Sequence, residues 1–402
     1  MKPATTDVPG AQFPGHPLLR RRDGHHARVT YEELFFDLVY VFAVTQLSHE
    51  LLHNLTVAGV VETLILWFAV WLGWQYTCWV TNWFDPETPH IRGLMFVTML
   101  LGLVMAASIP MAFADRGLVF AAAYVAMQVG RTAFIALQLP AGHPLAPNYR
   151  RMLGWLLISA VFWLSGAMVQ HEARAPLWLL AVLCEYVSPM FGFALPGMGR
   201  SHTRDWTIEG GHLAERCQLF VIVALGETLL ASGATLAGAA EWDVPVVLAL
   251  LATFLGTLAM WWLYFGTSSK DATNAISHSE DPGRIGAYFH YVHALLIAGV
   301  IASAVGNDLV LAHPHAHPAT AQIAILLAGP AIYLLGSAAY KRIVYGAIPM
   351  SHLVGALLLL ALVPVGLVAD MLLMGWLTTA VVLIVSFWEA RLLLGRRNSD
   401  AA

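Results

Sequence analysis

The chain has 402 residues, of which 58% are hydrophobic and only 11% are charged. Soluble domains carry about 25% charged residues, and a water-soluble protein of this size could not bury so much apolar surface. The composition therefore excludes a soluble protein and predicts an all-α membrane protein whose main partner is the lipid bilayer. The net charge of −4 at pH 7 gives no support for a nucleic-acid partner.

About twelve apolar segments approach the ~20 residues that a helix needs to cross the hydrocarbon core. Turn-forming residues such as Asp85-Pro86 and Asp281-Pro282-Gly283 separate several of them. We therefore predict about 12 transmembrane helices. The predicted spans are 33–52, 59–80, 93–113, 117–138, 153–170, 176–194, 215–237, 245–268, 287–306, 320–338, 353–370 and 374–394.

Basic residues predict the orientation, because cytoplasmic segments of membrane proteins are enriched in Lys and Arg. With the N-terminus inside, sixteen of the 21 Lys and Arg residues fall in cytoplasmic segments. Only Arg116 and Arg174 fall in external loops, and three lie within or at the ends of spans. We expect both termini in the cytoplasm and the protein in the cell membrane.

The chain divides into four parts on this interpretation. Residues 1–30 form a polar tail, which we expect to be disordered, residues 31–197 and 198–395 form two six-helix halves, and residues 396–402 form a short tail. Glu33 aligns with Glu215 at an offset of 182, and Glu185 in span six has a counterpart in Glu389 in span twelve. Because six is even, such halves would be a parallel repeat about an axis along the membrane normal.

Two acidic stretches carry a resemblance to a known family. The residues ELFFDLVYVFAVTQLSH (Glu33–His49) and HLAERCQLFVIVALGET (His212–Thr228), with WWLYFG (Trp261–Gly266), resemble the low temperature requirement protein A (LtrA-like) family. The resemblance implies a bacterial polytopic membrane protein and no agreed substrate or catalytic residue set. Cys217-Gln218 departs from the aromatic-glycine pair that is usual in the family at this point.

Carboxylates inside apolar spans are the main candidates for a functional site, because such residues are costly in the membrane. Glu33 and Asp37 lie four residues apart and share a helix face near the cytoplasm. They could form a proton or cation site at a cytoplasmic vestibule. They could also be interfacial acids that the helix dipole stabilises.

Glu227 lies about twelve residues into span seven, roughly 18 Å along the helix axis and close to the midplane. Thr45 and Gln46 occupy the equivalent depth in span one. Glu227 could line a polar pathway or form half of a structural ion pair. Arg131, deep in span four, is a candidate partner, because a buried guanidinium requires pairing.

The sequence does not decide among Asp37, Glu185 and Glu227 as the partner of Arg131, and an anion-binding role for Arg131 is also open. Glu185 lies at the middle of span six and is a further candidate for the pathway. Glu215, at the start of span seven, is also a candidate for this pathway.

Glu215, Arg216, Glu389 and Arg391 lie at span ends, where snorkelling to the interface explains them. Embedded acids outnumber embedded bases, which favours cation or proton handling.

His290 and His293 lie three residues apart on span nine and could belong to a proton relay or to interior packing. A metal site would need more ligands than these two, so no metal and no cofactor is predicted. Trp67, Trp71 and Trp74 form a helical stripe that indicates packing or a stacking wall for an organic substrate.

These features favour a secondary transporter, proton- or cation-coupled, of an unknown small molecule or ion. An ion or proton channel is the alternative, since the same acids could line a pore. A membrane-embedded enzyme or a structural protein ranks lower, because the sequence contains no HExxH, GxSxG or Walker motif. The oligomeric state stays open.

Overall fold

The computed structural model describes residues 16–20, 22, 27–140, 142–239, 241–266, 276 and 279–400, without the side chains of His171 and of residues 395–400. Across these ranges the regular structure is helical, with two isolated β-bridges and no strand. The prediction of an all-α protein is therefore confirmed.

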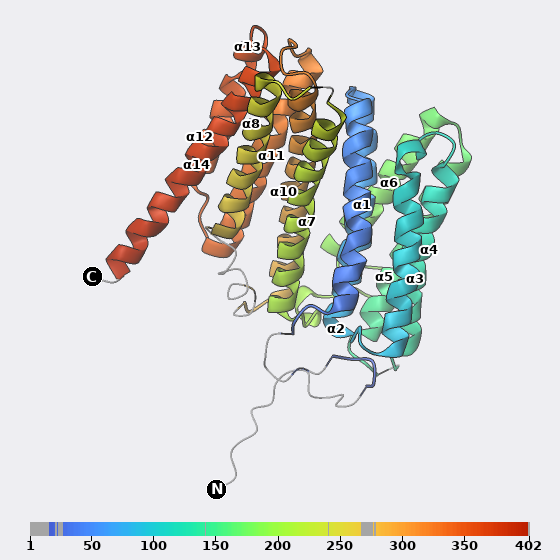
Figure 1. The fold of residues 1–402 in the computed structure, drawn as a ribbon. Helices are drawn as coiled ribbons and strands as arrows, with labels where there is room; N and C mark the ends of the chain where they lie inside the picture. The colour runs from blue at the N-terminus through green and yellow to red at the C-terminus, as the bar shows by residue number, and fades with distance from the viewer. Residues whose placement is uncertain are drawn as a thin grey trace.

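Six long helices form the first set, and five long helices with one broken helix form the second set (Figure 1). The first set is α1 (Tyr31–His53), α2 (Val57–Trp83), α3 (Pro89–Ser108), α4 (Gly117–Gln138), α5 (Ala146–Met168) and α6 (His171–Met190). The second set is α7 (Gly210–Gly238), α8 (Val244–Trp261), α10 (Pro282–Ala312), α11 (Thr320–Tyr345), α12 (Met350–Ala361) with α13 (Val363–Gly366), and α14 (Met371–Asp400). Short helices are η1 (Ile109–Met111), η2 (Thr203–Asp205) and the π-helix η3 (Trp262–Gly266).

Among the described residues, nine helices are long and apolar enough to cross a membrane. They are α2, α3 with η1, α4, α5, α7, α8 with η3, α10, α11 and α14. The three other predicted spans fall on α1, α6 and the α12–α13 pair. The predicted span 353–370 is not one helix, because Pro364 cannot donate a backbone hydrogen bond and interrupts the helix after Ala361.

Each set of helices has the same order of neighbours. In the first set, α1 packs against α2 and α3, the chain continues by neighbours from α3 to α6, and α6 returns to α2. In the second set, α7 packs against α8 and α10, the chain continues from α10 to α14, and α14 returns to α8. The two sets lie side by side in Figure 1, with α1 and α7 adjacent between them.

The sets meet where α1 and α2 contact α7 and α10, and we call this contact the seam. Hydrogen bonds join Glu33 to His212, Asp37 to Arg216 and Ser48 to Glu227, each across 179 residues. Because the separation is constant, α1 and α7 run in the same direction and keep one register along the seam.

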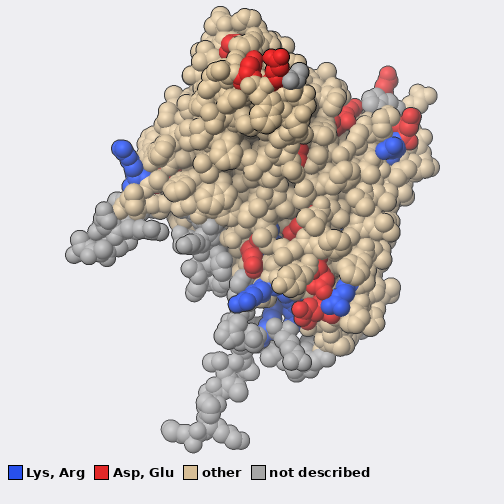
Figure 2. Space-filling model, viewed as in Figure 1, with Lys and Arg blue, Asp and Glu red and all other residues tan. Residues whose placement is uncertain are grey.

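The tightest helix pair is α10 with α11, whose backbones touch at glycines. A Cβ built on Gly299 would lie 2.3 Å from the backbone nitrogen of Tyr333, and one on Gly336 would lie 2.8 Å from that of Leu296. Small residues allow this close approach between helices in membranes. Figure 2 shows a face on which charged side chains lie mainly near the two ends, with few between them.

Part of the predicted N-terminal tail is ordered against the helices. Residues 1–15, 21 and 23–26 lie outside the described residues, but the backbone N–H of Arg20 donates to the carbonyl oxygen of Trp83 at 2.9 Å. Asp85 N donates to the carbonyl oxygen of Leu18 at 2.8 Å, and the Leu18 side chain is buried. The expectation of disorder is therefore wrong for residues 16–20.

Candidate functional site

Glu33 lies at the centre of a buried charge network at the start of α1. Its carboxylate accepts hydrogen bonds from the Thr30 backbone N–H at 2.9 Å and completes a capping box with the Thr30 hydroxyl. One oxygen also accepts from Arg20 at 2.8 Å, and the other lies 2.7 Å from Nε2 of His212. Glu33 therefore fixes the end of α1 and ties it to the N-terminal segment and to α7.

Asp37 lies one turn further along α1 and forms an ion pair with Arg216 of α7. Their atoms Oδ1 and Nη2 are 2.7 Å apart, and the indole N–H of Trp74 donates to the same oxygen at 2.8 Å. Arg216 is 0% exposed, so the predicted snorkelling of this residue is wrong. Asp37 Oδ2 and Arg216 Nε have no hydrogen-bond partner among the described residues.

The basic partners on α7 have a spacing that could have identified them. His212 and Arg216 lie four residues apart, as do Glu33 and Asp37, so each pair covers one helix face. The repeat alignment pairs Glu33 with Glu215 at an offset of 182. The hydrogen bonds between α1 and α7 instead join residues 179 apart, such as Glu33 with His212. Glu215 is half-buried near the start of α7, and Arg216 beside it is the residue that pairs with Asp37.

Glu227 occupies the seam further along α7, where it is 1% exposed. One carboxylate oxygen accepts a hydrogen bond from the hydroxyl of Thr45, and the other accepts one from Ser48 at 2.7 Å. Within the described ranges no basic side chain forms an ion pair with Glu227. Gln46, predicted at the same depth, is half-buried, and the two bonds to Glu227 come from Thr45 and Ser48 instead.

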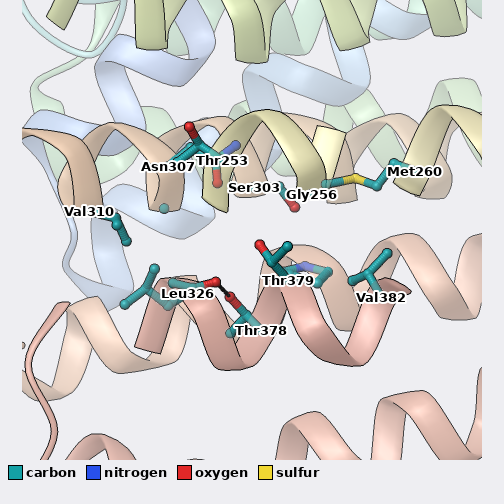
Figure 3. A pocket seen from close by; sticks show the side chains of 13 residues that line it. Thr253, Gly256, Met260, Ser303, Asn307, Val310, Leu326, Thr378, Thr379 and Val382 are labelled. Carbon is teal, nitrogen blue, oxygen red and sulfur yellow. Dashed lines mark hydrogen bonds between the residues drawn. The ribbon is translucent and has the colours of Figure 1, made fainter. Parts of the chain in front are cut away.

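A small cavity with a hydroxyl-rich wall lies within the second set, between α8, α10, α11 and α14 (Figure 3). We call it the hydroxyl cavity. Its polar lining residues are Thr253, Ser303, Asn307, Thr378 and Thr379.

All four hydroxyls that line it donate their protons to backbone carbonyl oxygens, at 2.8 to 3.0 Å. Their oxygen lone pairs therefore stay available to a water or a small polar solute.

Glu227 and the hydroxyl cavity are joined by neighbouring threonines. The hydroxyls of Thr228 on α7 and Thr257 on α8 lie 2.8 Å apart. Thr257 in turn donates to the carbonyl oxygen of Thr253, which lines the cavity. A band of polar groups thus leads from the α1–α7 contact into the interior of the second set.

Arg131 contacts α2 and not the seam acids Asp37 and Glu227. Its guanidinium donates to the hydroxyl of Thr77 at 2.8 Å and to the side-chain oxygen of Gln128. Among the described residues Arg131 forms no ion pair with Asp37, Glu185 or Glu227, so the ion-pair alternative is wrong for these acids. Neutral polar groups bind Nη1 and Nη2 in place of a carboxylate, and Nε has no hydrogen-bond partner among the described residues.

Glu185 is connected to Arg131 only indirectly. Its carboxylate accepts hydrogen bonds from Tyr124, from Ser159 at 2.7 Å and from the indole of Trp163 at 3.0 Å. Tyr124 accepts from Gln128, which also binds Arg131. Glu185 is thus a buried acid within the first set, and it does not reach the seam acids through these bonds.

Glu389 is paired inside the second set, so the predicted snorkelling of this residue is also wrong. Its carboxylate lies 2.7 Å from Nζ of the buried Lys341 and accepts a hydrogen bond from Ser351. Nδ1 of His352 lies 3.8 Å away. Arg391 is exposed, as snorkelling predicts.

His290 and His293 are fully buried on α10 and point to different partners. His293 Nε2 lies 2.7 Å from the hydroxyl of Tyr264, and Nδ1 lies 2.7 Å from the carbonyl oxygen of Phe289. His290 Nδ1 lies 3.0 Å from the carbonyl oxygen of Gly286 and 3.3 Å from the indole nitrogen of Trp79, and its Nε2 has no hydrogen-bond partner among the described residues. Among the described residues no group of three or more ligand-type side chains could hold a metal ion.

The aromatic stripe of α2 is packed into the core. Trp67, Trp71 and Trp74 are buried, and Trp71 and Trp74 contact the ring of Phe220 on α7. The packing alternative therefore describes these three residues, and they offer no stacking wall.

A family model described as Bacterial low temperature requirement A protein (LtrA) matches residues 28–387. A protein of Rhizobium meliloti (strain 1021), named Uncharacterized protein RA0937, is 37% identical over 390 residues, which cover 95% of this chain and 94% of that protein. No solved structure matches the chain. The matched range includes α1, α7 and both acidic stretches.

Proposed function

The chain belongs to the bacterial low temperature requirement A family of multi-pass membrane proteins, and we propose that it is a proton- or cation-coupled secondary transporter. Glu227 carries the proposal. It is a fully buried carboxylate inside an apolar helix, and two hydroxyls hold it in place of a basic side chain. Ionisable groups at such positions mark ion pathways and proton relays in membrane proteins.

The seam supplies acids at two depths. On α1, Glu33 and Thr45, which donates to Glu227, are about twelve residues apart, which is roughly 18 Å along a helix. Glu33 and Asp37 are balanced by Arg20 and Arg216, whereas the partners of Glu227 among the described residues are the hydroxyls of Thr45 and Ser48. A proton or a small cation that reaches Glu227 would therefore change the net charge at the seam.

Unpartnered polar atoms support a hydrated path along the seam helices. Asp37 Oδ2, Trp71 Nε1, Arg216 Nη1 and His290 Nε2 are buried and have no hydrogen-bond partner among the described residues. They belong to α1, α2, α7 and α10, the four helices that form the seam. Buried polar groups are almost always satisfied, so waters or a transported species are the natural partners here.

The proposal includes twelve spans, a parallel repeat and cytoplasmic termini. The matching order of neighbours in the two sets supports the repeat. So do Glu185 and Glu389, because each lies on the last helix of its set and accepts a hydrogen bond from a serine on the preceding span. The parallel direction of α1 and α7 agrees with an axis along the membrane normal.

Flux into proteoliposomes tests the transporter proposal. The vesicles contain the purified protein and a pH-sensitive dye, a potassium diffusion potential drives the flux, and a panel of metabolites and cations is added in turn. We expect a substrate-dependent, saturable proton flux that Glu227→Gln abolishes. Glu172→Gln, the same change at the exposed start of α6, should leave it unchanged.

Other outcomes of this experiment contradict the proposal. Proton flux without any added substrate, linear in the driving force, would identify a channel. Flux of wild-type size in Glu227→Gln would remove the observation on which the proposal rests.

A further inference from the structure

A second cavity lies between the two sets, at the ends of α2 and α6 and the start of α10. Its volume is about 60 Å³, and one side of it is open to the outside. We call it the aromatic cavity. The rings on its wall are those of Tyr76, Trp79, Trp83, Tyr149, Phe193, Trp206 and Tyr291.

The rings form a continuous wall that both sets build together. The centroid of Trp206, which follows η2, lies 5.7 Å from that of Trp79 and 5.4 Å from that of Trp83 on α2. Phe193, after α6, lies 6.2 Å from Trp206. These separations are those of aromatic side chains in direct contact. The cavity therefore offers flat, apolar surfaces to a bound ring.

Gly283 at the start of α10 keeps Trp206 in this wall. A Cβ at Gly283 would lie 2.0 Å from the carbonyl oxygen of Thr203 and 3.1 Å from Cβ of Trp206. Only glycine allows the segment after α6 to approach α10 so closely. The backbone contact at Gly283 therefore fixes the position of Trp206 in the wall.

Three polar atoms of the lining have no partner. Gln75 Oε1, Tyr76 Oη and Tyr149 Oη are buried and make no hydrogen bond among the described residues, and Tyr149 is 0% exposed. Buried polar groups without a partner are rare in native proteins, because each one is costly. The hydroxyls of Tyr76 and Tyr149 could therefore donate to a molecule in the cavity, and Gln75 Oε1 could accept from it.

The charge around the cavity limits the class of ligand. No Asp, Glu, Lys or Arg occurs among its described lining residues. The guanidinium carbon of Arg131 lies 5.8 Å from the centre of the Tyr76 ring. A nearby positive charge and the lack of a carboxylate in this lining disfavour an organic cation, although the rings alone could accept one.

We propose that the aromatic cavity binds an uncharged, planar ring compound that carries a hydrogen-bond donor and an acceptor on its edge. The ring stacks on the indole wall, its donor reaches Gln75 Oε1, and its acceptor receives the hydroxyls of Tyr76 and Tyr149. The proposal concerns binding, so it stands or falls separately from the transport of protons or cations through Glu227.

The test is equilibrium binding of 4-hydroxybenzamide to the full-length protein in detergent, measured by saturation-transfer NMR against protein-free micelles. A probe of this size is expected to bind with a Kd on the order of 1 mM. Its cationic counterpart, (4-hydroxyphenyl)trimethylammonium, should bind more weakly. Stronger binding of the cation would overturn the proposed ligand class.

Two variants test the polar contacts without disturbing the fold. Tyr149→Phe and Tyr76→Phe each remove only a hydroxyl that has no partner among the described residues, so the unfolding temperature should not fall. Each should weaken binding of the probe roughly threefold to tenfold, the value of one hydrogen bond.

Tyr333→Phe, which removes a hydroxyl that donates to the Met260 carbonyl outside the cavity, should leave binding unchanged. Wild-type affinity in both cavity variants, or no binding of the neutral probe up to its solubility limit, would refute the proposal.

Discussion

The ion pair between Asp37 and Arg216 allows a quantitative test of the seam. Asp37→Asn would leave the Arg216 guanidinium fully buried, with the Glu33 carboxylate 4.0 Å away as its nearest remaining charge partner. Removing one member of a buried ion pair costs about 3–5 kcal/mol. Arg216→Met should cost a similar amount, because Asp37 would keep only the hydrogen bond from Trp74.

The double variant Asp37→Asn/Arg216→Met should be far more stable than the sum of the two single changes. It removes both charges together, and replacing a whole buried pair is often nearly neutral. We expect the double variant to lower the free energy of unfolding by roughly 2 kcal/mol. The amide oxygen of the introduced asparagine still accepts from the indole of Trp74, and a well-packed methionine replaces the guanidinium. The free energy of unfolding would be measured by reversible denaturation in mixed micelles.

An exposed pair provides the matched control for this cycle. Arg92 and Glu32 lie 2.8 Å apart, but the Arg92 side chain is 42% exposed. The same double-mutant cycle on this pair should give a coupling energy below about 1 kcal/mol. If the Asp37 and Arg216 changes instead add to within about 0.5 kcal/mol, the two residues do not interact and the reasoning is refuted.

Two further predictions concern the N-terminal segment and the orientation. Arg20→Gln should lower the unfolding free energy by roughly 2 kcal/mol, because it unpairs one side of the buried Glu33 carboxylate while His212 remains. A wild-type unfolding curve for this variant would show that the segment is not part of the network. A membrane-impermeant maleimide should label Ala316→Cys in intact cells and should label Glu87→Cys only after lysis, and the reverse pattern would contradict cytoplasmic termini.

The general architecture could be predicted from the sequence because it follows from composition and length. Apolar segments near 20 residues are nearly unambiguous in a membrane. In its described residues each predicted range falls mainly on a helix or, for 353–370, on a broken one, and residues 267–268 of the range 245–268 lie outside the described residues. Breaks inside apolar segments are harder to predict. Pro364 favours the end of a helix, whereas the apolar residues around it favour a continuous span.

The candidate site was predictable only in part. Glu33, Asp37 and Glu227 stood out because a carboxylate in an apolar helix is costly. Their partners depend on how two helices lie against each other, and hydropathy carries no information on that register. Arg216 was misassigned for this reason, since its position near the start of a span is equally compatible with snorkelling and with burial.

The glycine contacts between α10 and α11 have a consequence for movement. Where two backbones touch, no side chain lies between them that could change rotamer and absorb a displacement. The pair should therefore behave as one rigid body, whereas α7 and α8 face α10 through side chains.

α10 contacts α7 on one side and carries Ser303 of the hydroxyl cavity on another. A tilt of α7 at Glu227 would therefore shift α10 and α11 together. A displacement of α7 at the seam would thus change the shape of the hydroxyl cavity.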